Sequence, residues 1–378
     1  MKRVISIVFN NFRHDSRVLK ECITLRNAGY EVKVLALHDG DLPEEEVIEG
    51  VPVRRIRLKT RQWSKNRLVQ LLKYAELWYR VIGLSRQADI LHCNDLEPLP
   101  LCVLIKWFFN RKAKIVYDAH ELEFDKSDAD TKYYPRFMLR AAEKFFIGHA
   151  NAMMVVSPLI ADAYVKRYGI ARPVVVMNCP YFREPGPHED LFRKKFGIQP
   201  HQRIFLYQGG LSPHRGVELL LEIFRDLDEN YVLVVLGFGM LVPLVQEAAA
   251  KHPNIFYHPA VSPTELDRFT ACADVGFCLY QGFSGNHNLT IGNKIFQYIM
   301  AGLPVIASNL EGLKYVLTDK MGIVVKDFRD REQLGLAIRE IGTWKPSDYL
   351  PHLEEASRKY NWENQEPALL NVYRTLYE

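Results

Sequence analysis

The chain has 378 residues, of which 48% are hydrophobic and 25% charged, and its formal net charge is +4. This length exceeds what one hydrophobic core usually organises, so two domains are expected, and the composition excludes general disorder. The net charge is too small to indicate a nucleic-acid partner, and we expect none. No apolar run reaches the 18 residues of a transmembrane helix, and the opening run VISIVF predicts a strand rather than a signal peptide.

The cysteines show no CxxC spacing and mostly lie in apolar runs: Cys22, Cys93, Cys102, Cys179, Cys272 and Cys278. We therefore expect free thiols in the core of a protein from a reducing compartment. Together with the missing signal peptide, this favours a cytoplasmic protein.

Apolar strands alternate with amphipathic helices from the start of the chain. Strands are predicted at residues 3–9, 30–37, 88–94, 113–120, 152–157 and 173–178, and helices at residues 15–27, 99–109 and 136–150. Strands that are apolar on both faces and separated by helices are typical of a parallel, doubly wound sheet.

The composition turns polar and proline-rich at residues 180–198, which we interpret as a linker. The alternation then restarts, with strands predicted at residues 203–210, 231–239, 254–260, 273–280, 303–309 and 321–325. The sequence thus predicts two Rossmann-like α/β domains that are joined near residue 185 and face a common cleft. Ligands of such sheets bind outside the carboxyl ends of the strands, so we sought the functional site in the loops there.

Two of these loops are candidates for a phosphate site. In YQGGLSPHRGVELLLEIF, residues 207–224, a glycine turn leads into a helix that starts near Arg215. In NHNLTIGNKIFQYIM, residues 286–300, a polar loop with Lys294 opens onto a second helix. Helix N-termini and adjacent cations attract phosphate, although each pattern alone also fits a plain turn with a solvated cation. GFG at residues 237–239 is a third, weaker glycine turn.

Several motifs in this order resemble one family. They are DSRVLKECITLRNAGYEVKVLAL, ILHCND, IVYDAHE, VVSPLIADAYVKRYG, VVMNCP, YQGGLSPHRGVELLLEIF and NKIFQYIMAGLPVIAS. Together they resemble the retaining GT-B glycosyltransferases of group one, family four in the sequence classification, over almost the full length. The resemblance implies an acceptor-side domain at residues 1–185 and a nucleotide-sugar-binding domain at residues 186–360. It also implies that YNWENQEPALLNVY belongs to a closing helix, residues 361–378, that crosses back to the first domain.

The resemblance also implies how the donor is held. The family binds the donor diphosphate with an Arg and a Lys, spaced R-x4-K; here Gly210 stands at the Arg position and Arg215 at the Lys position. Lys294 is placed to supply the second cation. Of the family's two glutamates, the first aligns with Leu289, which cannot replace it. The second, which holds the ribose, aligns with Gln297, whose amide oxygen can still accept a hydrogen bond.

A histidine that contacts the transferred sugar often ends a first-domain strand in this family, and His120 in YDAHELEFD matches it. Its implied role is to position the sugar and to stabilise charge near the anomeric carbon. The alternative is a packing histidine beside a helix-capping Asp118. Glu121, on the acceptor side, and Asp118 are minor candidates.

The loop after the first strand is often glycine-rich in the family and borders the acceptor. Here it carries Asn10, Asn11 and Arg13, which we assign to the acceptor side. Asp15 is expected to cap the following helix and Arg17 to be a surface charge.

The candidate donor-binding residues share a location at strand ends of the second domain: Gly209, Gly210, Arg215, Gly237, Asn288, Thr290, Asn293, Lys294 and Gln297. The candidate catalytic residues are His120, Arg215 and Lys294. We expect no metal, because the two cations and the helix dipoles would neutralise the leaving diphosphate. We also expect no cofactor, since a UDP- or GDP-linked sugar would be the substrate.

Residues 54–86 hold ten basic residues and one acid, Glu76, interleaved with aromatic residues. A helix from about Lys65 would have a broad apolar face. In one interpretation this face covers the core and buries Leu72 and Trp78. In the other the segment docks on an anionic membrane surface, which would suit a lipid-linked acceptor.

The sequence therefore predicts a cytoplasmic hexosyl- or related glycosyltransferase, peripheral on the inner face of the membrane in the second interpretation. It would move a sugar with retention to a glycan or lipid-linked acceptor, as in the synthesis of cell-surface polysaccharide or glycolipid. Two alternatives stay open. Leu289 and Gln297 favour a non-catalytic relative that binds a nucleotide or a partner, and an enzyme of the same fold that modifies the nucleotide sugar itself is the other.

Overall fold

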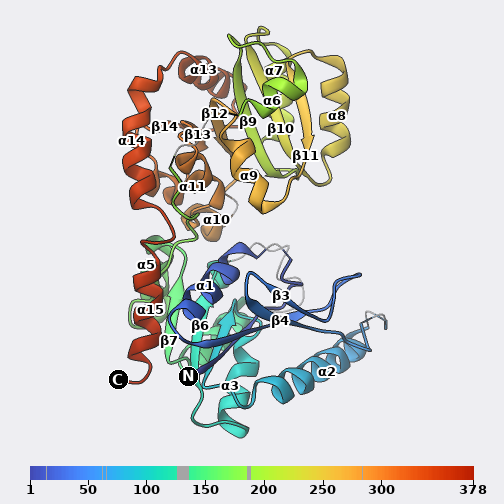
Figure 1. Cartoon of the computed structure of the whole chain (residues 1–378), viewed down its shortest axis with the longest axis vertical. Coiled ribbons are helices and arrows are strands. Elements are labelled where there is room, and N and C mark those ends of the chain that lie inside the picture. The colour runs from blue at the N-terminus through green and yellow to red at the C-terminus, as the bar shows by residue number, and fades with distance from the viewer. Residues whose placement is uncertain (14, 62, 65, 126–135, 185–188, 283) are drawn as a thin grey trace. The chain divides into compact units, whose positions relative to one another are not determined.

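The computed structural model describes residues 1–13, 15–61, 63–64, 66–125, 136–184, 189–282 and 284–378. The chain forms two compact units (Figure 1). The first unit combines Met1–Asn178 with Gln365–Glu378, and the second unit is Cys179–Asn364. The chain thus changes unit after residues 178 and 364, whereas the sequence placed these changes at residues 185 and 360.

The sheet of the first unit has the strand order β3-β4-β2-β1-β5-β6-β7-β8. Its strands are β1 (Arg3–Ile7), β2 (Glu31–Leu37), β3 (Glu45–Ile48), β4 (Val51–Ile56), β5 (Ile90–Asn94), β6 (Lys114–Ala119), β7 (Ala152–Val155) and β8 (Val174–Val175). All pairs are parallel except β3 with β4, a hairpin whose turn residues Glu49 and Gly50 both have positive φ. The sequence did not predict this hairpin, because the half-exposed run EEVI in β3 lacks the apolar character of a buried strand.

The described residues of the first unit form seven helical segments: α1 (Ser16–Asn27), α2 (Arg67–Ser85), α3 (Leu99–Phe108), the 3-10 segment η1 (Glu123–Asp125), α4 (Arg136–Ile147), α5 (Pro158–Tyr168) and α15 (Glu366–Thr375). The predicted cap of α1 is confirmed, since the side chain of Asp15 accepts a hydrogen bond from the Val18 amide. The closing helix α15 packs on this unit: the Thr24 hydroxyl donates to Glu366 over 2.7 Å.

The sheet of the second unit is wholly parallel, in the order β11-β10-β9-β12-β13-β14. Its strands are β9 (Arg203–Gly210), β10 (Tyr231–Phe238), β11 (Ile255–Pro259), β12 (Val275–Cys278), β13 (Val305–Ser308) and β14 (Gly322–Val325). Its helices are α6 (Leu191–Phe196), α7 (Val217–Arg225), α8 (Val242–Lys251), α9 (Pro263–Thr270), α10 (Gly285–Leu289), α11 (Asn293–Met300), α12 (Glu311–Val316), α13 (Arg331–Gly342) and α14 (Pro346–Lys359). The prediction of two doubly wound sheets is confirmed.

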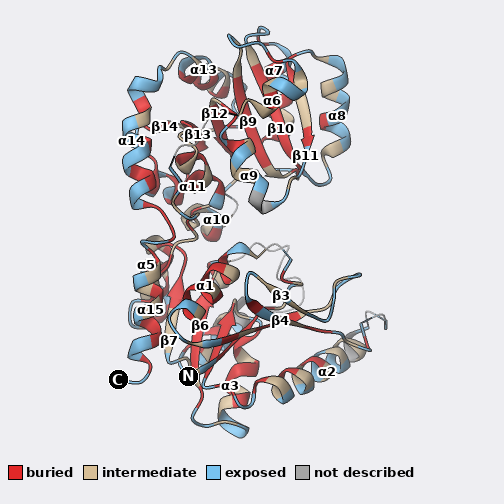
Figure 2. Ribbon diagram, viewed as in Figure 1, coloured by how far each residue is buried: buried red, intermediate tan, exposed pale blue. Residues whose placement is uncertain are grey.

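The central strands of both sheets are buried while the outer faces of the helices are exposed (Figure 2). All six cysteines are buried and none forms a disulfide, as predicted. None of the described helices is long and apolar enough to cross a membrane. One local prediction is wrong: part of the polar loop before α11 forms the short helix α10, where the Ser284 hydroxyl caps the His287 amide.

β9 and β10 approach each other closely at their carboxyl ends, and this requires a glycine at position 237. It pairs with Gly209, and a Cβ at Gly237 would lie 1.9 Å from the Gly209 carbonyl oxygen. Gly237→Ala should therefore force the two strand ends apart and lower the free energy of unfolding by about 1–3 kcal/mol. Urea unfolding measures the change.

Gly335 in α13 is the matched control, because a Cβ there would meet nothing within 4 Å. Gly335→Ala should raise the free energy of unfolding by about 0.5–1 kcal/mol, since alanine favours a helix interior. Equal midpoints for the two variants would contradict the close approach.

Candidate functional site

Lys294, the second residue of α11, has a buried amine with no hydrogen-bond partner among the described residues. The residue is 8% exposed, and its Nζ lies 4.2 Å from the ring centroid of Tyr207 and 5.3 Å from that of Tyr280. Gly209 makes room for it: a Cβ on this residue would lie 3.0 Å from Lys294 Cε. The ends of β9 and β12 and the start of α11 therefore meet around this amine.

Burial lowers the pKa of Lys294 to about 7, because it removes the ammonium from water and no described carboxylate pairs with it. An unpaired charge of this kind is costly inside a protein. Two aromatic faces stabilise the ammonium only in part. The amine at the N-terminus of α11 is thus suited to an anion that brings its own negative charge.

Arg215 brings a second cation to the same place. Its guanidinium carbon lies 5.7 Å from the ring centroid of Tyr280, and it has no ion-pair partner in the described part of the chain. The turn that carries it has two left-handed residues, His214 and Gly216, directly before α7. A Cβ on Gly210 would lie 4.0 Å from the Arg215 guanidinium. The structure therefore brings together Gly209, Gly210, Arg215 and Lys294.

Gln297 lies one turn after Lys294 on α11, and its side-chain oxygen already accepts a hydrogen bond. The donor is Nε2 of Gln208, over 2.9 Å, and the oxygen of Gln208 accepts in turn from the Thr270 hydroxyl over 2.8 Å. An amide oxygen has two lone pairs, so Gln297 keeps capacity for one more donor. The buried Gln208, which fixes this orientation, was not recognised in the sequence because a glutamine next to a glycine turn carries no motif.

The other predicted donor residues hold the loop itself. The Asn288 oxygen accepts from the Glu311 amide over 3.1 Å and so caps α12, and the Thr290 hydroxyl donates to Asn286 over 3.1 Å. Asn293 is exposed at the start of α11, and Leu289 is half-buried. For these residues a contact with the donor stays a prediction.

In the first unit, Arg17 and Asp118 form a buried ion pair. The Nε and Nη2 atoms of Arg17 donate to the two oxygens of Asp118 over 2.8 and 2.7 Å, and its Nη1 donates to the Val176 carbonyl over 2.6 Å. The expectation that Arg17 is a surface charge is wrong, since the residue is only 3% exposed. The first turn of α1 faces the ends of the strands, and this directs Arg17 to Asp118 on β6.

His120 follows β6 and lies between two carboxylates. Its Nε2 is 2.8 Å from Asp118 Oδ2, and its Nδ1 is 3.5 Å from Oδ2 of Asp95, which follows the neighbouring strand β5. Burial alone would lower the pKa of His120, but Asp118 and Asp95 raise it to about 10. His120 is therefore an imidazolium near neutral pH, and it cannot act as a general base there.

Behind this pair lies a group of potential metal ligands. Glu21, His92 and Asp118 each bring one ligand atom to within 4.8 Å of the others. Arg17 occupies both oxygens of Asp118 and lies 3.1 Å from Glu21, so a cation already compensates the group. Burial raises the pKa of Glu21 to about 8 and lowers that of His92 to about 4. Both are thus neutral near pH 7, and we assign no metal to them.

The predicted acceptor-side loop is held by its own hydrogen bonds. The Asn10 amide donates to Asp15 over 2.8 Å, and the Asn11 side-chain oxygen accepts from the Arg13 amide over 3.1 Å. Arg13 and Glu121 are exposed. Their contact with an acceptor stays a prediction.

Two family models match the chain. Glycosyltransferase Family 4 matches residues 16–181, and Glycosyl transferases group 1 matches residues 188–359. The chain belongs to the group 1 glycosyltransferases.

Relatives of known name agree with this. An uncharacterized glycosyltransferase of Methanocaldococcus jannaschii is 22% identical over 375 residues, which cover 93% of this chain and 91% of that protein. The chitobiosyldiphosphodolichol beta-mannosyltransferase of Kluyveromyces lactis is 23% identical over 175 residues, 44% of this chain and 38% of the relative's length. HepE of Anabaena, solved in complex with UDP and glucose, has a TM-score of 0.76 at 14% identity, over 99% of this chain and 100% of that one. The predicted GT-B fold is confirmed.

In the folded glycosyltransferase, acids from neighbouring segments pair with some cations of the basic segment 54–86. The antiparallel β3 places Glu45 opposite Arg54, and Arg61 pairs with Asp39 over 2.7 Å. The core-helix interpretation is also wrong for Leu72, which is 54% exposed. Trp78 is half-buried, so α2 covers the core with a narrow stripe only.

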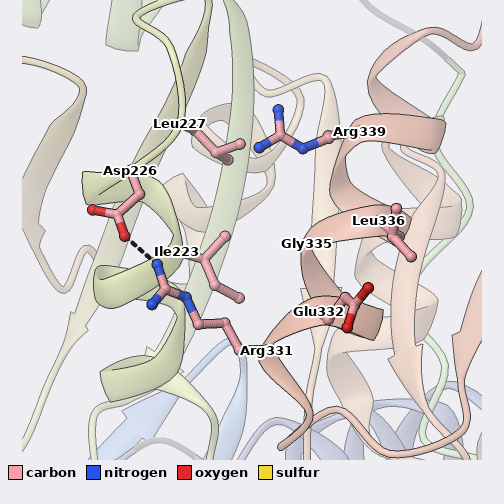
Figure 3. A pocket seen from close by; sticks show the side chains of 8 residues that line it. All are labelled: Ile223, Asp226, Leu227, Arg331, Glu332, Gly335, Leu336 and Arg339. Atoms are coloured by element: carbon pink, nitrogen blue, oxygen red, sulfur yellow. Dashed lines mark hydrogen bonds and ion pairs between the residues drawn. The ribbon is translucent and has the colours of Figure 1, made fainter.

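A hollow of about 380 Å³ elsewhere in the second unit lies between α7 and α13 (Figure 3). Arg331 on one wall forms an ion pair with Asp226 on the other. None of its lining residues belongs to the group around Lys294, so we do not assign the donor to it.

The ion pair in the first unit leads to a stability prediction. Arg17→Ala leaves Asp118 as a buried charge without its main partner, and the free energy of unfolding should fall by about 3–5 kcal/mol. Arg225→Ala is the control, because this arginine forms an exposed pair with Asp226 and should change stability little. Urea unfolding compares the two variants. A loss for Arg17→Ala no larger than that of the control would contradict the buried pair.

Proposed function

We propose that the chain transfers a hexosyl or related sugar, with retention, from a UDP- or GDP-linked donor to a glycan or a lipid-linked acceptor. The observation that carries this proposal is the buried amine of Lys294, which has no counter-ion in the described chain and lies beside Arg215 at the carboxyl ends of β9 and β12. A nucleotide diphosphate supplies the missing negative charge. HepE, which was solved with UDP and glucose, supports a UDP-sugar as the first probe.

The leaving diphosphate would be held by chain groups alone. Lys294 and Arg215 would each donate to a phosphate, and the N-terminus of α11 would add free amides. We propose on this basis that the transfer needs no metal. Complete loss of turnover in excess EDTA would contradict that part of the proposal.

His120 would position the transferred sugar. As an imidazolium held between Asp118 and Asp95, it can donate to a sugar hydroxyl and place a fixed charge near the reacting carbon. It cannot accept the proton of the attacking hydroxyl, so the proton must leave through another group. Arg17 acts through Asp118 and is a positioning residue in this proposal.

The alternative of a non-catalytic nucleotide-binding relative rests on Leu289, which offers no carboxylate where the family has one. Incubation with a panel of nucleotide sugars separates the two functions. Slow hydrolysis of one donor supports the transferase, whereas binding without any hydrolysis or transfer supports the alternative.

Lys294→Met should have opposite effects on binding and on stability. It should weaken binding of the donor by about 1.5–3 kcal/mol, the range for hydrogen bonds to charged groups, and Arg215→Ala should do the same. In the free protein the methionine removes an unpaired buried cation, so unfolding should cost a few kcal/mol more at and below pH 7. Calorimetry and urea unfolding measure the two effects, with the exposed Lys320→Met as the control.

The sign of the pH dependence follows from the lowered pKa of Lys294. Between pH 7 and 10.5 the unfolded chain holds a proton that the folded chain has lost, so wild-type stability rises with pH and the gain in Lys294→Met shrinks. Affinity for UDP-glucose should fall as the pH rises above 7, because the amine must first be protonated. Unchanged donor affinity in both Lys294→Met and Arg215→Ala would contradict the proposed diphosphate site.

For His120→Ala the effect should fall on turnover. Donor affinity should drop little while kcat collapses, because the assigned role is stronger in the transition state than in the ground state. Steady-state kinetics with the best donor of the panel separates kcat from KM. A near-normal kcat would mean that His120 only packs.

A further inference from the structure

A group of large apolar side chains is exposed where α3 ends and α4 packs beside it. We call it the aromatic patch: Trp107, Phe108, Phe109 and Phe145. Phe108 is 73% exposed, and Phe109 and Phe145 are 55% and 51% exposed. The rings of Trp107 and Phe145 meet edge to face with centroids 6.1 Å apart, so the exposed rings of the two helices adjoin.

The core of the first unit does not need these side chains. Along α3 the residues that cover the sheet are buried, namely Leu99, Leu101, Cys102, Val103 and Ile105. The aromatic residues follow at the end of the helix and continue beyond it. Exposed aromatic side chains in such a cluster are uncommon on a monomer surface and mark a contact with something else.

The segments that carry the aromatic patch are strongly basic. Residues 99–114 and 136–151 hold seven lysines and arginines and one acid, Glu143. Glu143 is buried and accepts hydrogen bonds from Tyr164 and Tyr168 over 2.7 Å each. The exposed Arg111, Lys112 and Lys144 form no ion pair with any described residue. In the basic segment 54–86, in contrast, Arg54, Arg57 and Arg61 form ion pairs with Glu45, Glu44 and Asp39.

We propose that the aromatic patch inserts into an anionic lipid bilayer, with Arg111, Lys112 and Lys144 over the acidic headgroups. Aromatic side chains favour the depth of the headgroups, and basic residues around them gain from the surface potential. The helix α2 also packs against α3. This inference deepens the proposed function, in which a lipid-linked acceptor brings the chain to a membrane.

A bilayer fits this surface better than a second copy of the chain. In a symmetric dimer the same patch would face itself. Arg111, Lys112 and Lys144 of the two copies would then meet without acids to pair with. An anionic bilayer accepts both the apolar side chains and the cations.

Flotation of the full chain with vesicles tests the proposal. We expect binding to phosphatidylcholine vesicles that contain 30% phosphatidylglycerol, no binding to phosphatidylcholine alone, and release as salt rises, because exposed charges are screened over about 8 Å at physiological ionic strength. The double variant Phe108→Ser with Phe109→Ser should lose at least about ten-fold in vesicle affinity, since both rings leave the bilayer. Replacing Arg111, Lys112 and Lys144 with Gln should cost about five-fold per cation.

The control is Tyr315→Ser with Leu336→Ser, two exposed apolar residues of the second unit, which should float as wild type does. Flotation of the Phe108 and Phe109 variant at wild-type level would overturn the proposal. So would a dimer in light scattering that this variant dissociates. A chain that binds vesicles but transfers no sugar would contradict the proposed function, while the membrane proposal would still hold. Turnover on a soluble acceptor by a chain that does not float would support the proposed function and contradict the membrane proposal.

Discussion

A buried amine without a counter-ion among the described residues is the constraint that shapes the candidate donor site of the second unit. Lys294 is enclosed by Tyr207, Tyr280 and the backbone of Gly209, none of which carries a charge. The free chain resolves this conflict by lowering the pKa of the amine to about 7. A bound anion would instead pair with the protonated amine. Binding of a diphosphate would then relieve the free-energy cost of burying the unpaired amine, which favours the bound state. Gly209 leaves room for the amine, because a Cβ there would lie 3.0 Å from Lys294 Cε, and Gly237 lets β10 pair closely with Gly209.

The first unit buries a negative charge and compensates it with its own side chains. Asp118 is fully buried, and Arg17 satisfies both of its oxygens in a bidentate pair. Burial would raise the pKa of Asp118, but Arg17 and His120 hold it well below its usual range. The charges within this group cancel without any ligand. These contacts hold His120 in one orientation at the end of β6. Lys294, in contrast, has no counter-ion among the described residues.

The sequence predicted the two sheets because their strands are apolar on both faces, a pattern that is typical of parallel sheets covered by helices. It failed where a residue's role depends on a distant partner. Arg17 has no sequence feature that separates it from a surface arginine, since Asp118 lies 101 residues away and meets it only when α1 covers the end of β6. Gln208 was missed for the same reason. The pairing of β3 with β4 was missed because four half-exposed residues carry no core signal.

The site prediction relied mainly on features of the local backbone. Glycine turns and helix starts are local features, and they led to Gly209, Arg215 and Lys294, which the fold brings together. The density of basic residues along the sequence was a poorer guide to where unpaired cations lie on the surface. Residues 54–86 are the most basic run of the chain, yet β3 and the loop before it carry acids that pair with three of their cations. The ends of α3 and α4 hold fewer cations in the sequence, but exposed cations there have no ion-pair partner in the described chain and lie beside exposed rings. The field at a surface depends on which charges the fold leaves without partners, and this information is absent from any single segment.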